Sequence, residues 1–234
     1  MSPHLERLTV LATVTMLLAL PAAASDWENV LGIYGIGASI SGTGTIRDLE
    51  LDIDVDFDEI LDKLEMGGMA RYRGQSGKLA VVGDAVFMGL GEGGADLDLL
   101  VLEGSVGYRI TKVVEGFIGL RYTDYQFDLR NSGPLQDHRV TAGRTFYDPI
   151  VGVRAQGPIG NRWNIQGRGD VGGFGIGMDL TWRVEANIGF EASRLVDIWA
   201  GYVALGQDFD AGPNDRLAMD VVYQGPQLGV FFKF

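Results

Sequence analysis

The feature that most constrains the fold is a strict alternation of polar and apolar residues, repeated in one segment after another. In residues 163–176 the polar series is Asn164, Gln166, Arg168 and Asp170, and Trp163, Ile165 and Val171 lie in the intervening series. The segments 97–109, 114–129, 145–157 and 180–192 repeat the pattern. Since successive side chains of a strand point to opposite faces, each segment predicts a strand with one charged face and one apolar face.

The alternation predicts ten strands and an all-β fold. We place them at residues 29–42, 64–73, 78–91, 97–109, 114–129, 145–157, 163–176, 180–192, 196–208 and 218–234. The expected architecture is a closed antiparallel up-and-down transmembrane β-barrel, with an eight-strand barrel as the alternative because the first two segments are the least regular. An even number of strands returns both termini to one side of the membrane, which we expect to be the periplasm.

Alternation alone does not separate a membrane barrel from a soluble periplasmic ligand-binding barrel, which would bury the apolar face. Three further features favour the membrane. Short turns alternate with longer loops, the strands are long enough to cross a tilted bilayer path, and aromatic residues gather near the strand ends. We expect Trp163, Tyr108, Phe190 and Tyr72 at one rim, and Trp182, Tyr147, Tyr122 and Phe87 at the other.

The chain begins with the pattern of a secretion signal. Arg7 precedes a short apolar run over residues 8–20, and small residues follow at 21–24. We therefore expect a signal peptide over residues 1–24 and a single barrel domain over residues 25–234. No later segment has the roughly 18 uninterrupted apolar residues that a transmembrane helix requires.

The last strand carries apolar residues in alternate positions that end on an aromatic residue. Leu228, Val230, Phe232 and Phe234 form this series. It resembles the C-terminal assembly signal of bacterial outer-membrane proteins, which the barrel assembly machinery reads. Residues 55–61, 148–154, 169–175 and 225–229 resemble an uncharacterised family of small Gram-negative outer-membrane barrels of the OmpA/OmpW-like, porin type. The resemblance implies a location in the outer membrane and a fold, without a substrate or a catalytic residue. It departs at Val203, where an arginine is expected.

The inward faces of such a barrel would carry charges of both signs. The expected lumen set comprises Arg71, Arg73, Asp84, Glu103, Arg109, Glu115, Arg121, Asp148, Arg154, Arg168, Asp170, Arg183 and Glu185. Because unpaired charge in a narrow, low-dielectric space is costly, these groups should pair. Two interpretations stay open: a network that stiffens the wall, or a narrow passage for small polar solutes, for which inward glycines such as Gly107, Gly152 and Gly172 would leave room.

The acidic segment 48–64 is the least typical part of the chain. Asp52, Asp54, Asp56 and Asp58 alternate with apolar residues, and a short helical turn follows. A weak divalent-cation site, a lumen plug, a solvated acidic loop and an inserted strand hairpin are the alternatives. The pattern argues against an EF-hand, since no glycine stands at the sixth position of any Asp-x-Asp-x-Asp frame.

Composition narrows the function classes. The absence of cysteine excludes thiolate chemistry, and a formal net charge of −12 argues against nucleic acid as a partner. A lipid-modifying enzyme would depend on His138, in a segment that also holds Ser132 and Asp137, and no Gly-x-Ser-x-Gly elbow occurs. We expect no catalysis and no cofactor. The expected partners of this monomer are outer-membrane lipid, lipopolysaccharide and the assembly machinery.

Overall fold

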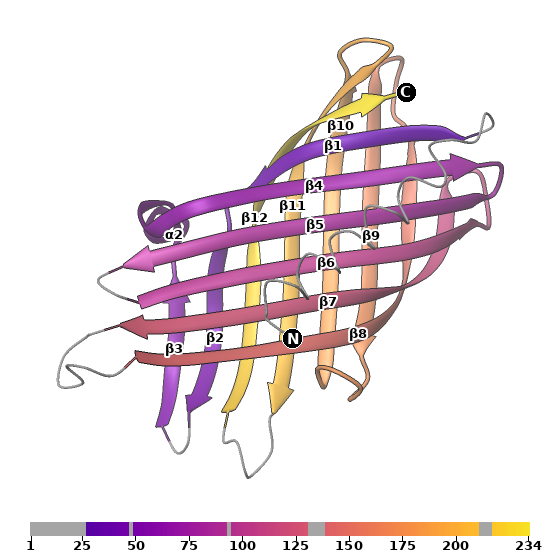
Figure 1. The fold of residues 1–234 in the computed structure, drawn as a ribbon. Helices are drawn as coiled ribbons and strands as arrows, with labels where there is room; N and C mark the ends of the chain where they lie inside the picture. Colours follow the sequence, from indigo (N-terminus) through magenta and orange to yellow (C-terminus); the bar gives the residue numbers. More distant parts are fainter. Residues whose placement is uncertain (1–26, 47–48, 93–94, 131–138, 211–216) are drawn as a thin grey trace.

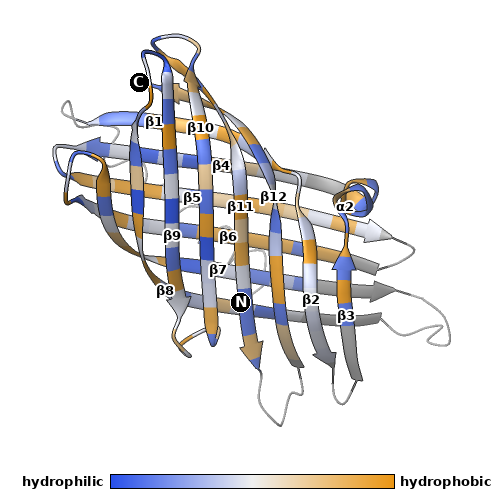
Figure 2. Cartoon of the chain, turned by 180° about the vertical axis from the view of Figure 1, so that it is seen from behind, coloured by the Kyte–Doolittle hydropathy of each residue, from blue (hydrophilic) through white to orange (hydrophobic). Residues whose placement is uncertain are grey.

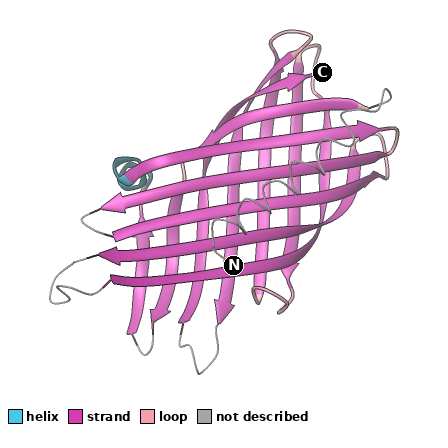
Figure 3. Ribbon diagram, in the orientation of Figure 1, coloured by secondary structure: helices cyan, strands magenta, loops and turns pink. Residues whose placement is uncertain are grey.

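The computed structural model describes residues 27–46, 49–92, 95–130, 139–210 and 217–234. Over these residues the chain is one antiparallel sheet of twelve strands with a single short helix (Figures 1 and 3). The strands are β1 (Glu28–Ile36), β2 (Ser39–Ile46), β3 (Leu49–Val55), β4 (Leu64–Ser76), β5 (Leu79–Glu92), β6 (Ala95–Arg109), β7 (Val114–Arg130), β8 (Arg139–Pro158), β9 (Trp163–Gly173), β10 (Leu180–Glu191), β11 (Val196–Asp210) and β12 (Leu217–Lys233), and the helix is α2 (Phe57–Lys63). The expected signal peptide and His138 lie outside the described residues.

The sheet closes because β1 pairs on one side with β4 and on the other with β12. β2 continues along β12 where β1 ends, so β1 and β2 together fill one of ten positions around the barrel. The ten-strand expectation is confirmed, and the predicted strand 29–42 is interrupted at residues 37–38. Within the described ranges β3 pairs only with β2, so the acidic segment forms the second strand of an inserted hairpin and then α2.

The two ends of the barrel differ. The first and last strands, β1 and β12, meet at one end, where the Asn29 amide donates to the Phe234 carbonyl over 3.1 Å. The four short turns that join β4 to β5, β6 to β7, β8 to β9 and β10 to β11 lie at the same end. We call this the termini end, and we call the opposite end, where β7 joins β8, the loop end. β8 begins six residues earlier than expected, because its pairing with β7 continues to Arg130↔Arg139. The alternation of residues 139–142 is short and is broken at Gly143 and Arg144, so the pattern did not join these residues to the strand.

The barrel wall exposes its apolar face and encloses its charges. Ile118, Val153 and Val184 are 67%, 56% and 55% exposed, whereas Arg121 and Glu103 are 1% and 4% exposed. Figure 2 shows the resulting alternation of hydrophobic and hydrophilic residues along the strands. This arrangement is the inverse of a soluble sandwich, and it matches a barrel whose outer surface contacts hydrocarbon.

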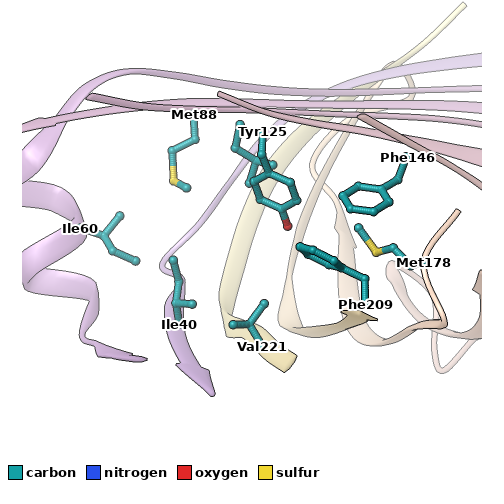
Figure 4. Packing of buried hydrophobic residues seen from close by; sticks show 9 residues of the cluster. Ile40, Ile60, Met88, Tyr125, Phe146, Met178, Phe209 and Val221 are labelled. Carbon is teal, nitrogen blue, oxygen red and sulfur yellow. The ribbon is translucent and has the colours of Figure 1, made fainter. Parts of the chain in front are cut away.

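An apolar core fills the lumen toward the loop end (Figure 4). It consists of Ile40, Ile60, Met88, Leu99, Tyr125, Phe146, Met178, Phe209 and Val221, all buried. Ile60 comes from α2, which connects β3 to β4 and contacts β2 and β5 (Figure 1). Among the described residues, no helix is long and apolar enough to cross a membrane. The lumen thus has an apolar layer toward the loop end, and its buried charges lie between this layer and the termini end.

Candidate functional site: the charge network of the lumen

The strand register places opposite charges side by side on the inner wall. Arg71 lies opposite Asp84, Glu103 opposite Arg121, Glu115 opposite Arg154, and Asp170 opposite Arg183. Opposite charges at directly facing positions of an antiparallel pair stabilise the pairing. Alternation assigned these residues to one face, but only the register determines which of them meet.

The deepest part of the network is a closed ring of four charges from three strands. Arg121 Nη2 lies 3.1 Å from Glu103 Oε2 and 2.8 Å from Asp170 Oδ1. Arg168 Nη2 lies 2.7 Å from both Glu103 Oε1 and Asp170 Oδ2. All four side chains are at most 3% exposed. Water therefore does not reach this level of the lumen along these side chains.

A second cluster spans the barrel from β4 and β5 to β10. Arg71 bridges Asp84 and Glu185, with nitrogen–oxygen distances of 2.7 and 2.8 Å. Arg183 reaches the same two carboxylates at 3.4 and 3.0 Å. The Tyr34 hydroxyl donates to Asp84 Oδ1 over 2.5 Å. These contacts tie opposite walls of the barrel together across its interior.

The third cluster centres on Glu115, nearer the termini end. Its carboxylate oxygens lie 2.5 Å from Arg73 Nη2 and 3.0 Å from Arg154 Nη1. Arg154 also donates to Ser105 Oγ over 2.7 Å, and its guanidinium lies 3.6 Å from the centre of the Phe117 ring. Cation–π stacking adds to the stabilisation of a desolvated arginine. Phe117 was missed by the sequence reasoning because it is an apolar residue in an otherwise polar, inward series.

Two members of the expected network form no ion pair within the described structure. Arg109 is half-buried at the termini end. Asp148 is fully buried, accepts the Met178 backbone N–H over 2.6 Å, and leaves its Oδ2 without a hydrogen-bond partner. Asp148 thus fixes the connection between β9 and β10, residues 174–179, which brings Met178 into the apolar core.

The inward glycines make room for this network. A Cβ at Gly107 would lie 2.3 Å from Glu115 Oε1, and one at Gly152 would lie 2.7 Å from the Phe117 ring and 2.5 Å from the Gly169 carbonyl oxygen. The space that these glycines leave is therefore occupied by neighbouring groups. Open space remains toward the termini end, in a cavity of about 330 Å³ bordered by Arg73, Arg109, Lys112 and Arg154, and in one of about 100 Å³ bordered by Arg71 and Glu185.

The remaining expected residues take the following positions. Leu228, Val230, Phe232 and Phe234 are exposed on the outer face of the last strand. Val203 is buried opposite Glu185, whose charge is met by Arg71 and Arg183 instead of by the expected arginine. Asp52, Asp54, Asp56 and Asp58 are exposed. Among the described residues, no three or more acids or histidines group closely enough to hold a metal ion.

The fold is that of outer-membrane β-barrel proteins. The structure is similar to the outer membrane protease OmpT from Escherichia coli at a TM-score of 0.58, with 7% identity over 89% of this chain and 97% of that one. Ail of Yersinia pestis shows 13% identity and a TM-score of 0.40, over 90% of this chain and 100% of that one. Neisserial surface protein A shows 13% identity and a TM-score of 0.37, over 90% and 98%. No family model and no curated relative matches the sequence.

Proposed function

We propose that the protein is an outer-membrane barrel with a sealed lumen, whose role is structural and not that of a passive pore. The observation that carries the proposal is the buried ring of Glu103, Arg121, Arg168 and Asp170, in which each acid is bonded to both bases. The termini face the periplasm in this proposal, as expected for an even number of strands.

The apolar core supports the proposal independently. The apolar core and the charged layer follow one another along the lumen, so a solute crossing the barrel would have to displace the side chains of both layers. Ion pairs enclosed away from water also resist opening, because separating one leaves a charge buried without compensation. The narrow polar passage is the weaker alternative, since the open space at the termini end borders ion-paired side chains, Arg73, Arg154 and Glu115 in one cavity and Arg71 and Glu185 in a second.

Conductance across a planar bilayer tests the proposal. The refolded full chain is expected to insert, as shown by protection from added protease, without producing discrete current steps. A matched variant, Arg71→Gln with Glu185→Gln, removes one charge of each sign from the lumen and identifies steps that come from this lumen. Steps in the natural chain whose ion selectivity changes in the variant would establish the passage and overturn the seal.

The alternative function, a lipid-modifying enzyme, would depend on His138 and not on the charge network of the lumen. Since His138 lies outside the described residues, the structure adds nothing in its favour. The lipid profile of cells carrying His138→Ala would reveal it, because loss of a modified lipid in that variant requires catalysis.

A further inference from the structure

The four short turns at the termini end share a pattern that the lumen does not explain. Residues 77–78, 110–113, 159–162 and 192–195 each contain a single base and no acid. In every case an apolar residue follows the base directly: Lys78-Leu79, Lys112-Val113, Arg162-Trp163 and Arg194-Leu195. The four apolar side chains are 46–63% exposed. The barrel therefore repeats one amphipathic pair at each turn around this rim.

Two of the bases lie over outward-facing aromatic rings. Lys78 Nζ lies 5.6 Å from the centre of the Tyr108 ring, and Arg162 Cζ lies 4.7 Å from that of Phe190. Phe190 in turn packs against Trp163, with 4.9 Å between the ring centres. Aromatic residues at the rim of a membrane barrel sit at the level of the lipid headgroups. The positive charges of Lys78 and Arg162 are thereby held at that level, on the outer side of the wall.

The turn bases are not neutralised by the protein itself. Within the described structure, none of the four forms an ion pair, and Arg162 donates only to the backbone oxygens of Glu191 and Ala192. The nearby acid Asp197 pairs with Lys233 instead, at 2.9 Å. Glu28 and Glu191 are the other acids at this rim among the described residues, and Glu191 also lies 4.0 Å from Lys233. The loop end has the opposite character, since β3 and α2 alone expose Asp52, Asp54, Asp56, Asp58, Glu59 and Asp62.

We propose that the basic turns form an annular binding surface for anionic glycerophospholipid headgroups. The apolar residue of each pair enters the edge of the acyl layer, and the base donates to the headgroup phosphate. Lysine and arginine close to an anionic leaflet contribute favourably, and the effect declines within a Debye length. This inference rests on the membrane barrel of the proposed function and is independent of whether the lumen is sealed.

Trp163 provides a probe at the proposed site. In the background Trp27→Phe, Trp182→Phe, Trp199→Phe, the chain is refolded into phosphatidylcholine vesicles containing brominated phosphatidylglycerol or brominated phosphatidylcholine. Quenching of Trp163 then reports which lipid lies beside it. We expect phosphatidylglycerol to be preferred roughly fivefold, the factor for one base near the surface, and the preference to fall in 0.5 M salt.

Matched double variants assign the preference to the turns. Lys78→Gln with Arg162→Gln should bring the ratio close to one, whereas Lys63→Gln with Arg144→Gln, which removes the same charge at the loop end, should leave it unchanged. Lys112→Gln with Arg194→Gln, in turns without a ring contact, gives an intermediate ratio and serves if the first variant does not fold. Equal quenching by both lipids in the natural chain, or equal loss in the loop-end variant, overturns the inference. Absence of quenching by either lipid would overturn the membrane barrel as well.

Discussion

At the residue scale, the enclosed carboxylates are the most vulnerable groups of the molecule. Glu103 accepts from Arg121 and Arg168 and lies within 4.0 Å of Arg183 and Arg154. A buried ion pair contributes little net stability relative to an apolar pair, but removing one partner leaves the other uncompensated. Since Glu103 compensates several guanidiniums, its loss should cost more than the loss of a rim carboxylate.

Glu103→Gln is therefore expected to lower the free energy of unfolding by about 3 kcal/mol, the lower end of the range for breaking a buried pair. Urea titration of the refolded chain in lipid vesicles, followed by tryptophan fluorescence, measures this. Asp197→Asn is the matched control, because its pair with the partly exposed Lys233 should be worth less than about 1 kcal/mol. Equal losses in the two variants would show that the ring does not stabilise the fold.

At the element scale, the connection between β9 and β10 is held from inside the barrel. Gly173, Phe174 and Gly175 all have positive φ angles, of 86°, 54° and 70°, which turn the chain back toward the lumen. Phe174 is the non-glycine residue in this left-handed region, so the turn carries local strain. The Asp148 carboxylate, bonded to the Met178 amide, offsets that strain and seats Met178 among the apolar residues.

Asp148→Ala should release this connection without unfolding the barrel. Loss of the bond leaves the buried Met178 amide without an acceptor, which costs about 1–3 kcal/mol, so amide exchange at Met178 should accelerate by about 5- to 150-fold. Hydrogen–deuterium exchange with fragment mass spectrometry gives the rate, and the amides of β7 at residues 114–120 serve as the internal reference. Unchanged exchange at Met178 would mean that packing alone seats the residue.

The elements were predictable to the extent that their alternation was regular. The inward positions of Arg121, Arg168, Asp170 and Glu185 followed from period two alone. Their partners did not, since the Arg71–Glu185 bond joins residues 114 positions apart and depends on barrel closure. The division of the first predicted strand into β1 and β2 was also missed. Both strands pair with β12 on one side, but on the other side β1 pairs with β4 and β2 pairs with β3. Such an exchange is a property of the whole sheet and leaves no local signal.

At the scale of the whole molecule, folding and insertion into an amphiphile should be one event. The outer face exposes large apolar side chains on most strands, and the charges of the inner face are enclosed in the lumen. In water this surface would far exceed the few hundred Å² of contiguous apolar area that soluble monomers tolerate. In hydrocarbon the same apolar surface is favourably solvated. Closure of the barrel pairs the backbone N–H and C=O groups that an open sheet edge would leave without hydrogen bonds.

A chain of residues 25–234 should therefore remain unfolded or aggregated in plain buffer, and fold when detergent micelles or short-chain lipid vesicles are added. Folding is followed by migration on a gel, since a closed barrel resists the denaturing detergent until boiled and runs differently before and after heating. Circular dichroism of the same samples measures the sheet content, and sedimentation shows whether that sheet belongs to a dispersed barrel or to aggregate. A dispersed, sheet-rich monomer in buffer without any amphiphile would place the apolar face in water, and it would remove the basis for both the sealed barrel and the lipid-binding rim.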